Sequence, residues 1–151
     1  MLTQASRLIS AVNALGINAR TALERGEIDA AIYLLDQAGA DFGYRYEWER
    51  YGPFSETLAA DVVELTDEDL LNPADTGEAV KAAVEHVRPL IEEPAAGLKQ
   101  FTWIRLLASL DFLQRFAGEE LGAGGHPAYI EANFEQSVIE TAIERLRDFA
   151  D

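Results

Sequence analysis

The sequence contains no cysteine, and basic residues are scarce. Without cysteine the chain forms no disulfide, no thiolate metal site and no cysteine nucleophile, and its composition suits a reducing compartment. Twelve lysine and arginine residues stand against 27 aspartate and glutamate residues, which gives a formal net charge of −15 at pH 7. A charge of this sign repels nucleic-acid backbones and anionic lipid. Direct binding to nucleic acid or to membranes is therefore not expected.

Long hydrophobic runs are also missing. The most apolar stretch, residues 103–116, is interrupted by Arg105, Ser109, Asp111 and Arg115, whereas a membrane span needs about 20 apolar residues. The first 15 residues lack the basic start and the continuous apolar run of a signal peptide. These absences predict a cytoplasmic protein.

Acidic residues are concentrated in one part of the chain. No basic residue occurs between Arg50 and Lys81. The simplest interpretation of this stretch is a solvated acidic face that keeps the protein soluble. The alternatives are a docking surface for a basic partner or a surface that imitates nucleic acid. The acidic residues of the stretch are Glu56, Asp61, Glu64, Asp67, Glu68, Asp69, Asp75 and Glu78.

What the sequence does contain is helical periodicity. Apolar residues make up 48% of the 151 residues, enough for one domain, residues 1–151, to bury a core without disulfides or metal. Gly16 is expected to end the first helix, Ser55 and Thr76 to cap the third and fourth, and Pro89 to kink or restart the fourth. The fifth helix is the most apolar and is expected at the centre of the fold. Apolar spacing predicts helices over about 5–15, 26–39, 55–65, 76–91, 97–117 and 134–149.

Residues 42–48 follow a different period. Phe42, Tyr44, Tyr46 and Trp48 alternate with polar or small residues, a pattern typical of a strand with one aromatic face. The pattern does not identify the partner strand, for which 17–21 and 69–72 are weak candidates. Residues 51–55, Tyr-Gly-Pro-Phe-Ser, are expected to form a turn.

The expected fold is therefore mainly α: a compact helical domain of about six helices with a small β element around 42–48. The order helix, helix, strand, turn, helix is compatible with a winged-helix-like first half.

Few residues suggest chemistry. His86 falls within a predicted helix and His126 in a glycine-rich loop, and no metal-binding spacing joins them. The loop at 122–125 lacks the lysine and serine or threonine of a phosphate loop, so a hinge or helix terminator is the better interpretation. We assign no catalytic, cofactor-binding or metal-binding residue and expect no cofactor.

Asp111 is the exception among the carboxylates, because it lies in the most apolar helix, where burying a charge is costly. We expect either a partly exposed position or a structural pair with Arg105 or Arg115. The alternative is a catalytic acid.

The aromatic segment 42–54 is the most distinctive feature. Its first interpretation is core packing against the helices. The functional alternative is that Tyr51 and Phe54 form an exposed anchor for a protein partner, since tyrosine and tryptophan are frequent at binding hot spots. The candidate partner-binding residues are Trp48, Tyr51, Phe54, Asp61 and Glu64.

Several short motifs resemble one family. Tyr33-Leu34-Leu35, Phe42-Gly43-Tyr44-x-Tyr46, Tyr51-Gly52-Pro53-Phe54-Ser55 and Leu106-Leu107-Ala108-Ser109 are similar to motifs of the bacterial YwgA-like proteins, a family distantly similar to the Panacea antitoxin domain. The lysine-rich first helix typical of such proteins is absent here. The resemblance implies a helical, winged-helix-like domain associated with toxin neutralisation and mobile elements, and it carries no catalytic residues.

The leading hypothesis is a non-enzymatic protein-interaction module, antitoxin-like or associated with defence. A winged-helix transcription regulator is one alternative, although residues 55–65 contain no lysine or arginine. An acidic nucleic-acid mimic is another, and it predicts carboxylates along one face. An enzyme that uses Asp111 is the last. The fifth or the last helix could also pair with a copy of itself in a homodimer.

Overall fold

The computed structural model is mainly helical and describes residues 4–18, 20, 28–49, 52–66, 77–95, 97–116, 130 and 134–150. Within these ranges the elements are the helices α1 (Gln4–Ala14), α3 (Ile28–Gln37), α4 (Glu56–Val63), α6 (Glu78–Ile91), α7 (Gln100–Phe116) and α9 (Gln136–Ala150), and the strands β1 (Glu47–Glu49) and β2 (Gly52–Phe54). The expected helical fold with a small β element is confirmed.

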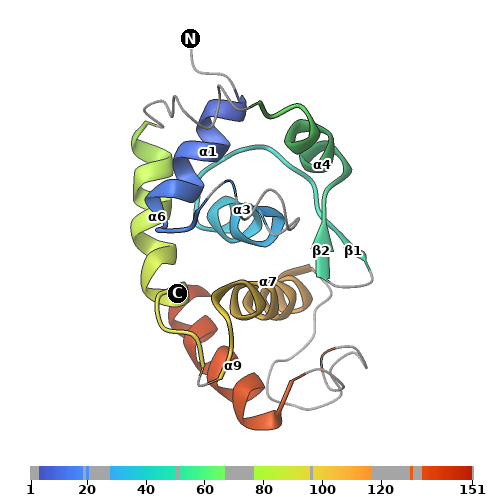
Figure 1. The fold of residues 1–151 in the computed structure, drawn as a ribbon. Helices are drawn as coiled ribbons and strands as arrows, with labels where there is room; N and C mark the ends of the chain where they lie inside the picture. Colours follow the sequence, from blue (N-terminus) through green and yellow to red (C-terminus); the bar gives the residue numbers. More distant parts are fainter. Residues whose placement is uncertain are drawn as a thin grey trace.

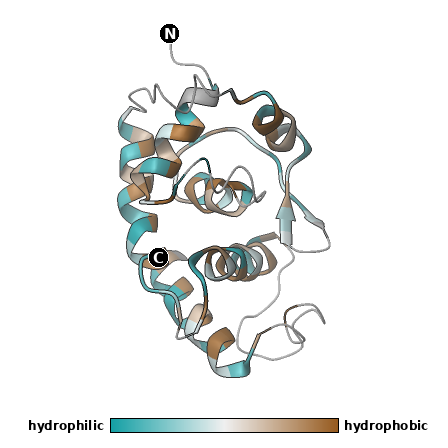
Figure 2. Cartoon of the chain, in the orientation of Figure 1, coloured by the Kyte–Doolittle hydropathy of each residue, from teal (hydrophilic) through white to brown (hydrophobic). Residues whose placement is uncertain are grey.

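Helices α3 and α7 form the centre of the fold. In Figure 1 they lie in the middle of the view, with α1 and α6 on one side, α4 and the β1–β2 hairpin on the other, and α9 beyond α7. Helix α7 contacts α3, α9, α6 and β2, and its residues 106–113 are all buried. The brown apolar stripes of the helices turn inward in Figure 2, and teal polar residues cover much of α6. The prediction that the fifth helix is central is therefore confirmed.

Helix boundaries follow local chemistry where they can be traced. Gly16 has φ +84° after the last turn of α1, the left-handed conformation expected of a glycine cap. The Ser55 hydroxyl accepts a hydrogen bond from the amide of Leu58 (3.2 Å), as an N-cap does. Helix α6 continues through Pro89 to Ile91 without restarting, and its N-cap is Gly77. Thr76, which was expected to cap it, lies outside the described residues.

The β element differs from the prediction. The predicted strand over 42–48 is shorter and shifted: β1 covers Glu47–Glu49, and its antiparallel partner is Gly52–Phe54. The expectation of a turn over 51–55 was wrong for residues 52–54, because Gly52 and Pro53 pair with Glu49 and Trp48 as part of β2. Residues 17–18 form no strand, and 69–72 lie outside the described residues.

The two helices proposed for self-pairing already use their apolar faces within the chain. Leu106, Leu107 and Leu110 of α7 are buried, as are Ile139, Ile143 and Leu146 of α9, whereas Phe116 at the end of α7 is exposed. Most of the two apolar faces is therefore covered within the chain. None of the described helices is both long and apolar enough to cross a bilayer.

Candidate functional site: the hairpin and the start of α4

The aromatic segment 42–48 has an inner and an outer side. Phe42 is buried, and Tyr44, Tyr46 and Trp48 pack against the core. The Trp48 ring lies 5.9 Å from the ring of Phe112 on α7, and the Tyr46 ring meets the Tyr33 ring edge-on at 4.9 Å. Core packing, the first interpretation of this segment, accounts for its aromatic side.

Three tyrosine hydroxyls donate to three aspartates, and two of these bonds fix residues 42–48 on the helices. Tyr44 donates to Asp61 of α4 at 2.6 Å, and Tyr46 donates to Asp36 of α3 at 3.1 Å. Beneath them Tyr33 of α3 donates to Asp111 of α7 at 2.8 Å. Burial, together with the neighbouring carboxylates, raises the pKa of each tyrosine above its ordinary value, so all three remain neutral donors. Tyr44 and Tyr46 thereby tie the segment that leads into β1 to α4 and α3, and Tyr33 ties α3 to α7.

The outer side of the same segment borders a hollow of about 300 Å³. In the β1–β2 register Glu47 stands opposite Phe54, and residues opposite each other in an antiparallel pair project to the same face. Arg45 precedes Glu47 by two residues and shares that face, while Glu56 and Thr57 contribute the first turn of α4. The residues that line this hollow, named here the outer hollow, are Arg45, Glu47, Phe54, Glu56 and Thr57.

The two glutamates of the outer hollow form no ion pair among the described residues. Glu47, Glu56 and Arg45 are exposed, and Phe54 is half-buried. Among the described residues, the carboxylates of Glu47 and Glu56 accept no hydrogen bond and form no salt bridge with Arg45 or with any other cation. The outer hollow therefore presents two carboxylates that no cation among the described residues neutralises.

The predicted partner-binding residues do not form a single patch. Trp48 stands opposite Pro53 and packs inward on Phe112, whereas Phe54 borders the outer hollow. Asp61 is half-buried and engaged by the Tyr44 hydroxyl, and Glu64 is exposed at the end of α4. Tyr51 lies outside the described residues. Sequence reasoning did not select Arg45, Glu47, Glu56 and Thr57. The hairpin register brings Arg45 and Glu47 to Phe54, and Glu56 and Thr57 follow Phe54 in the chain.

Asp111 is fully buried, so the expectation of a partly exposed position was wrong. The predicted pairing with Arg115 is present: the guanidinium Nε lies 2.8 Å from Asp111 Oδ2 and 3.0 Å from Oδ1. Burial raises the pKa of Asp111 above its ordinary value, against the hydrogen bond from Tyr33 and the charge of Arg115. With no exposed surface and both oxygens engaged, this carboxylate acts as a structural anchor between α3 and α7.

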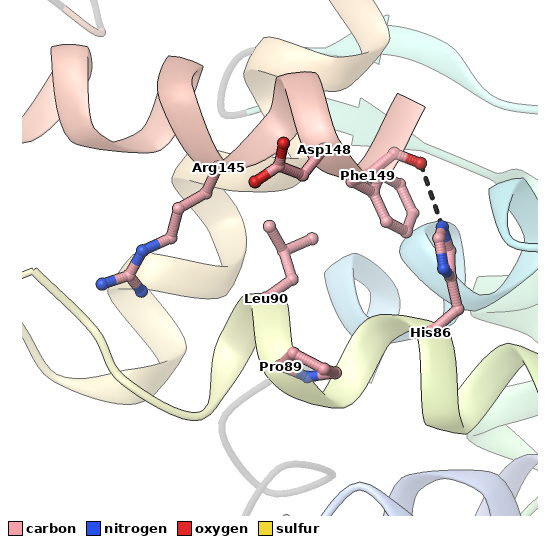
Figure 3. Close-up of a pocket in the computed structure, with 6 residues that line it drawn as sticks. All are labelled: His86, Pro89, Leu90, Arg145, Asp148 and Phe149. Carbon is pink, nitrogen blue, oxygen red and sulfur yellow. Dashed lines mark hydrogen bonds between the residues drawn. The ribbon is translucent and has the colours of Figure 1, made fainter. Parts of the chain in front are cut away.

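A second hollow, of about 250 Å³, lies between α6 and α9 (Figure 3). Its polar groups already serve the contact between elements. His86 Nε2 donates to the carbonyl of Phe149 at 3.0 Å, and the two rings stack at 4.9 Å. Arg145 lies over the Trp103 ring at 5.2 Å and donates to the carbonyl of Glu93. This hollow is best explained as the seam that fixes α9 on the body of the fold.

Metal-binding geometry is not found in the part of the chain that the structure describes, where no three histidine or acidic side chains converge. His86 is exposed on α6, as expected, and its hydrogen bond to the carbonyl of Phe149 links α6 to the end of α9. His126 and the loop 122–125 lie outside the described residues.

One helix carries a row of exposed carboxylates. Glu140, Glu144 and Asp148 of α9 are exposed and recur every four residues. Four residues advance an α-helix by about 6 Å and keep neighbouring side chains on one side of it. Regular spacing of this kind was the feature expected of a nucleic-acid mimic.

Comparisons of the chain with protein families, curated proteins and solved structures found no match. The site is therefore interpreted from its own geometry.

Proposed function

We propose that this protein is a non-enzymatic interaction module that binds a basic protein partner through the surface formed by the hairpin and α4. The observation that carries the proposal is the outer hollow, which is lined by a half-buried aromatic ring and by two carboxylates with no ion pair among the described residues. Glu64 extends the acidic surface to the far end of α4. A partner with clustered lysine or arginine complements this surface in charge, and the protein's net charge of −15 steers such a partner toward it.

The rigidity of this surface favours binding over catalysis. Tyr44 and Tyr46 fix the segment that leads into β1, and the Ser55 cap fixes the first turn of α4. A surface that is already ordered loses less conformational entropy when a partner binds. The one buried acid that could have served catalysis, Asp111, has no access to solvent.

An antitoxin-like or defence-associated role is the finer part of the proposal. It rests on the resemblance of the motifs within residues 30–65 and 106–113 to YwgA-like proteins. An antitoxin that covers a basic nucleic-acid-binding surface of its toxin needs an acidic, preformed docking face, and the hairpin and α4 provide one.

The experiment is a capture followed by reconstitution with purified partner. Wild type would be compared with a Glu56→Lys, Glu64→Lys double variant and with a matched control, Glu85→Lys, Glu92→Lys, which makes the same charge change on α6. A basic protein that binds wild type and control in calorimetry, binds the α4 variant at least tenfold more weakly, and loses affinity with added salt supports the proposal. Equal binding to all three proteins, or equal loss in both variants, contradicts it.

An acidic nucleic-acid mimic is the second candidate, and the row Glu140, Glu144 and Asp148 on α9 favours it. Its discriminating variant is Glu140→Lys, Glu144→Lys. If that variant, and not the α4 variant, releases a DNA-binding partner, and if double-stranded DNA competes with this protein for the partner, the mimic replaces the first proposal.

A winged-helix regulator has less physical support. Helix α3 has no basic residue and buries most of its side chains, and α4 also lacks lysine and arginine. Neither helix offers the exposed cationic face that reads a DNA groove.

A further inference from the structure

The outer hollow has the size and lining of a site for one long side chain. Its volume of about 300 Å³ is at the lower end of pockets that enclose small ligands. Phe54 contributes ring surface from β2, Glu47 comes from the facing position of β1, and Glu56 comes from the start of α4. One aromatic residue and two glutamates from three elements therefore line the same hollow.

The chemistry that matches this lining is a cation with a flat face. An arginine guanidinium is planar, presents five N–H donors in a fixed fork, and stacks on aromatic rings. It can donate to two carboxylates at once, whereas a lysine ammonium acts as a point charge. The carboxylates of Glu47 and Glu56 have no ion pair within the described residues, so a guanidinium would displace no internal partner.

We propose that the outer hollow binds an arginine side chain of a basic protein segment, with Glu47 and Glu56 accepting its N–H groups and Phe54 packing against its plane. The proposal rests on the proposed function, whose basic partner it supplies with an anchor residue. Arg45 borders the same hollow without pairing to either carboxylate, and its positive charge opposes a second guanidinium.

Because of these charges, removing a glutamate should weaken arginine binding, whereas removing Arg45 should strengthen it. The probe is N-acetyl-arginine amide, titrated into the ¹⁵N-labelled full chain and followed by amide chemical shifts. N-acetyl-citrulline amide, which has the same shape without the charge, is the control ligand. We expect arginine to shift amides of 45–47 and 54–57, and citrulline to shift them far less.

The variants make the assignment specific. Glu47→Gln and Glu56→Gln should each weaken arginine binding about two- to fivefold, the effect of losing one exposed charge pair. Arg45→Gln should strengthen it, and Glu85→Gln, an equal charge change on α6, should leave it unchanged. Folding is checked for each variant by its amide spectrum.

Three outcomes overturn the proposal: equal shifts with citrulline, unchanged affinity in both glutamine variants, or weaker binding in Arg45→Gln, which would mean that Arg45 supports the bound arginine and does not oppose it. Failure here is separable from failure of the proposed function. If the α4 charge reversal abolishes partner binding while arginine does not bind in the outer hollow, the proposed function is supported and the arginine site is contradicted. If arginine binds as expected and no basic partner is found, the arginine site is supported and the proposed function is contradicted.

Discussion

The Tyr33 hydroxyl donates to Asp111 Oδ2 at 2.8 Å and joins the two central helices across 78 residues of sequence. Both side chains are fully buried, so no solvent can replace either partner. Asp111 also holds Arg115, whose guanidinium reaches out over the Phe149 ring of α9 at 5.8 Å. One carboxylate thus connects α3, α7 and the end of the chain.

Removing the hydroxyl in Tyr33→Phe should lower the free energy of unfolding by about 2 kcal/mol, because a buried carboxylate loses a donor. Tyr44→Phe is the matched control: its bond to Asp61 is half-buried, water can substitute, and the cost should be about 1 kcal/mol or less. Urea unfolding measures both. Equal costs would mean that the central pair contributes no more than the peripheral one.

Gly52 approaches α7 closely. A β-carbon at this position would lie 2.6 Å from the Ser109 hydroxyl oxygen, and the glycine has φ +131°. Gly52→Ala should therefore destabilise the fold by about 1–3 kcal/mol through steric overlap and backbone strain. Gly43→Ala, where φ is +84° but nothing lies within 4 Å, should show the strain alone.

A double-mutant cycle separates the two costs. Ser109→Ala removes the obstructing oxygen, so Gly52→Ala should cost less in that background, with coupling of about 0.5 kcal/mol or more. Thermal unfolding of the four proteins gives the coupling. Strict additivity would show that the close approach of β2 to α7 is not what selects glycine.

Periodicity was sufficient to predict the helices and the central place of α7. The row of apolar residues at helical spacing indicates which side of each helix is buried, and a serine before the first turn predicts the Ser55 cap. Pairing of β1 with β2 was not predictable in the same way. Gly52 and Pro53 are more common in turns than in strands, and the close approach to Ser109 of α7, together with the positive φ, explains a paired glycine here.

The site was predictable on one side only. Alternation along 42–48 places Arg45 and Glu47 opposite the aromatic face, as the structure has them. Their meeting with Phe54 and Glu56 depends on the hairpin register, which no period in the sequence encodes. For Asp111 the sequence indicates the cost of burial but not the compensating donor, because Tyr33 is 78 residues away.

The cap of α4 supports the proposed docking surface. Ser55 is buried and its hydroxyl accepts from the Leu58 amide, so Ser55→Ala should cost about 1 kcal/mol. Hydrogen exchange should report faster exchange of the Leu58 amide while amides in α7 remain protected. Because Glu56 sits in the loosened turn, arginine binding at the outer hollow should also weaken, and unchanged binding would separate the cap from the site.

Stability should increase as the pH falls from 7 toward about 5. Burial raises the pKa of Asp29, Asp36 and Asp111 above the ordinary value of 3.8. A carboxyl whose pKa is higher in the folded state binds protons more tightly there. Its contribution to stability is therefore present below the unfolded-state pKa and is lost as the pH rises through the folded-state pKa. Repulsion among 27 acidic residues acts in the same direction.

Salt distinguishes these two causes, because it screens long-range repulsion and has little effect on buried groups. Urea unfolding between pH 7 and pH 5 should retain part of its pH slope at about 1 M salt, where the Debye length is about 3 Å. Asp36→Asn should flatten that residual slope, since it removes one of the three groups while the amide oxygen can still accept from the backbone amide of Phe42. If the free energy of unfolding no longer depends on pH at about 1 M salt, the pH dependence comes from surface repulsion, and the buried aspartates do not contribute to it.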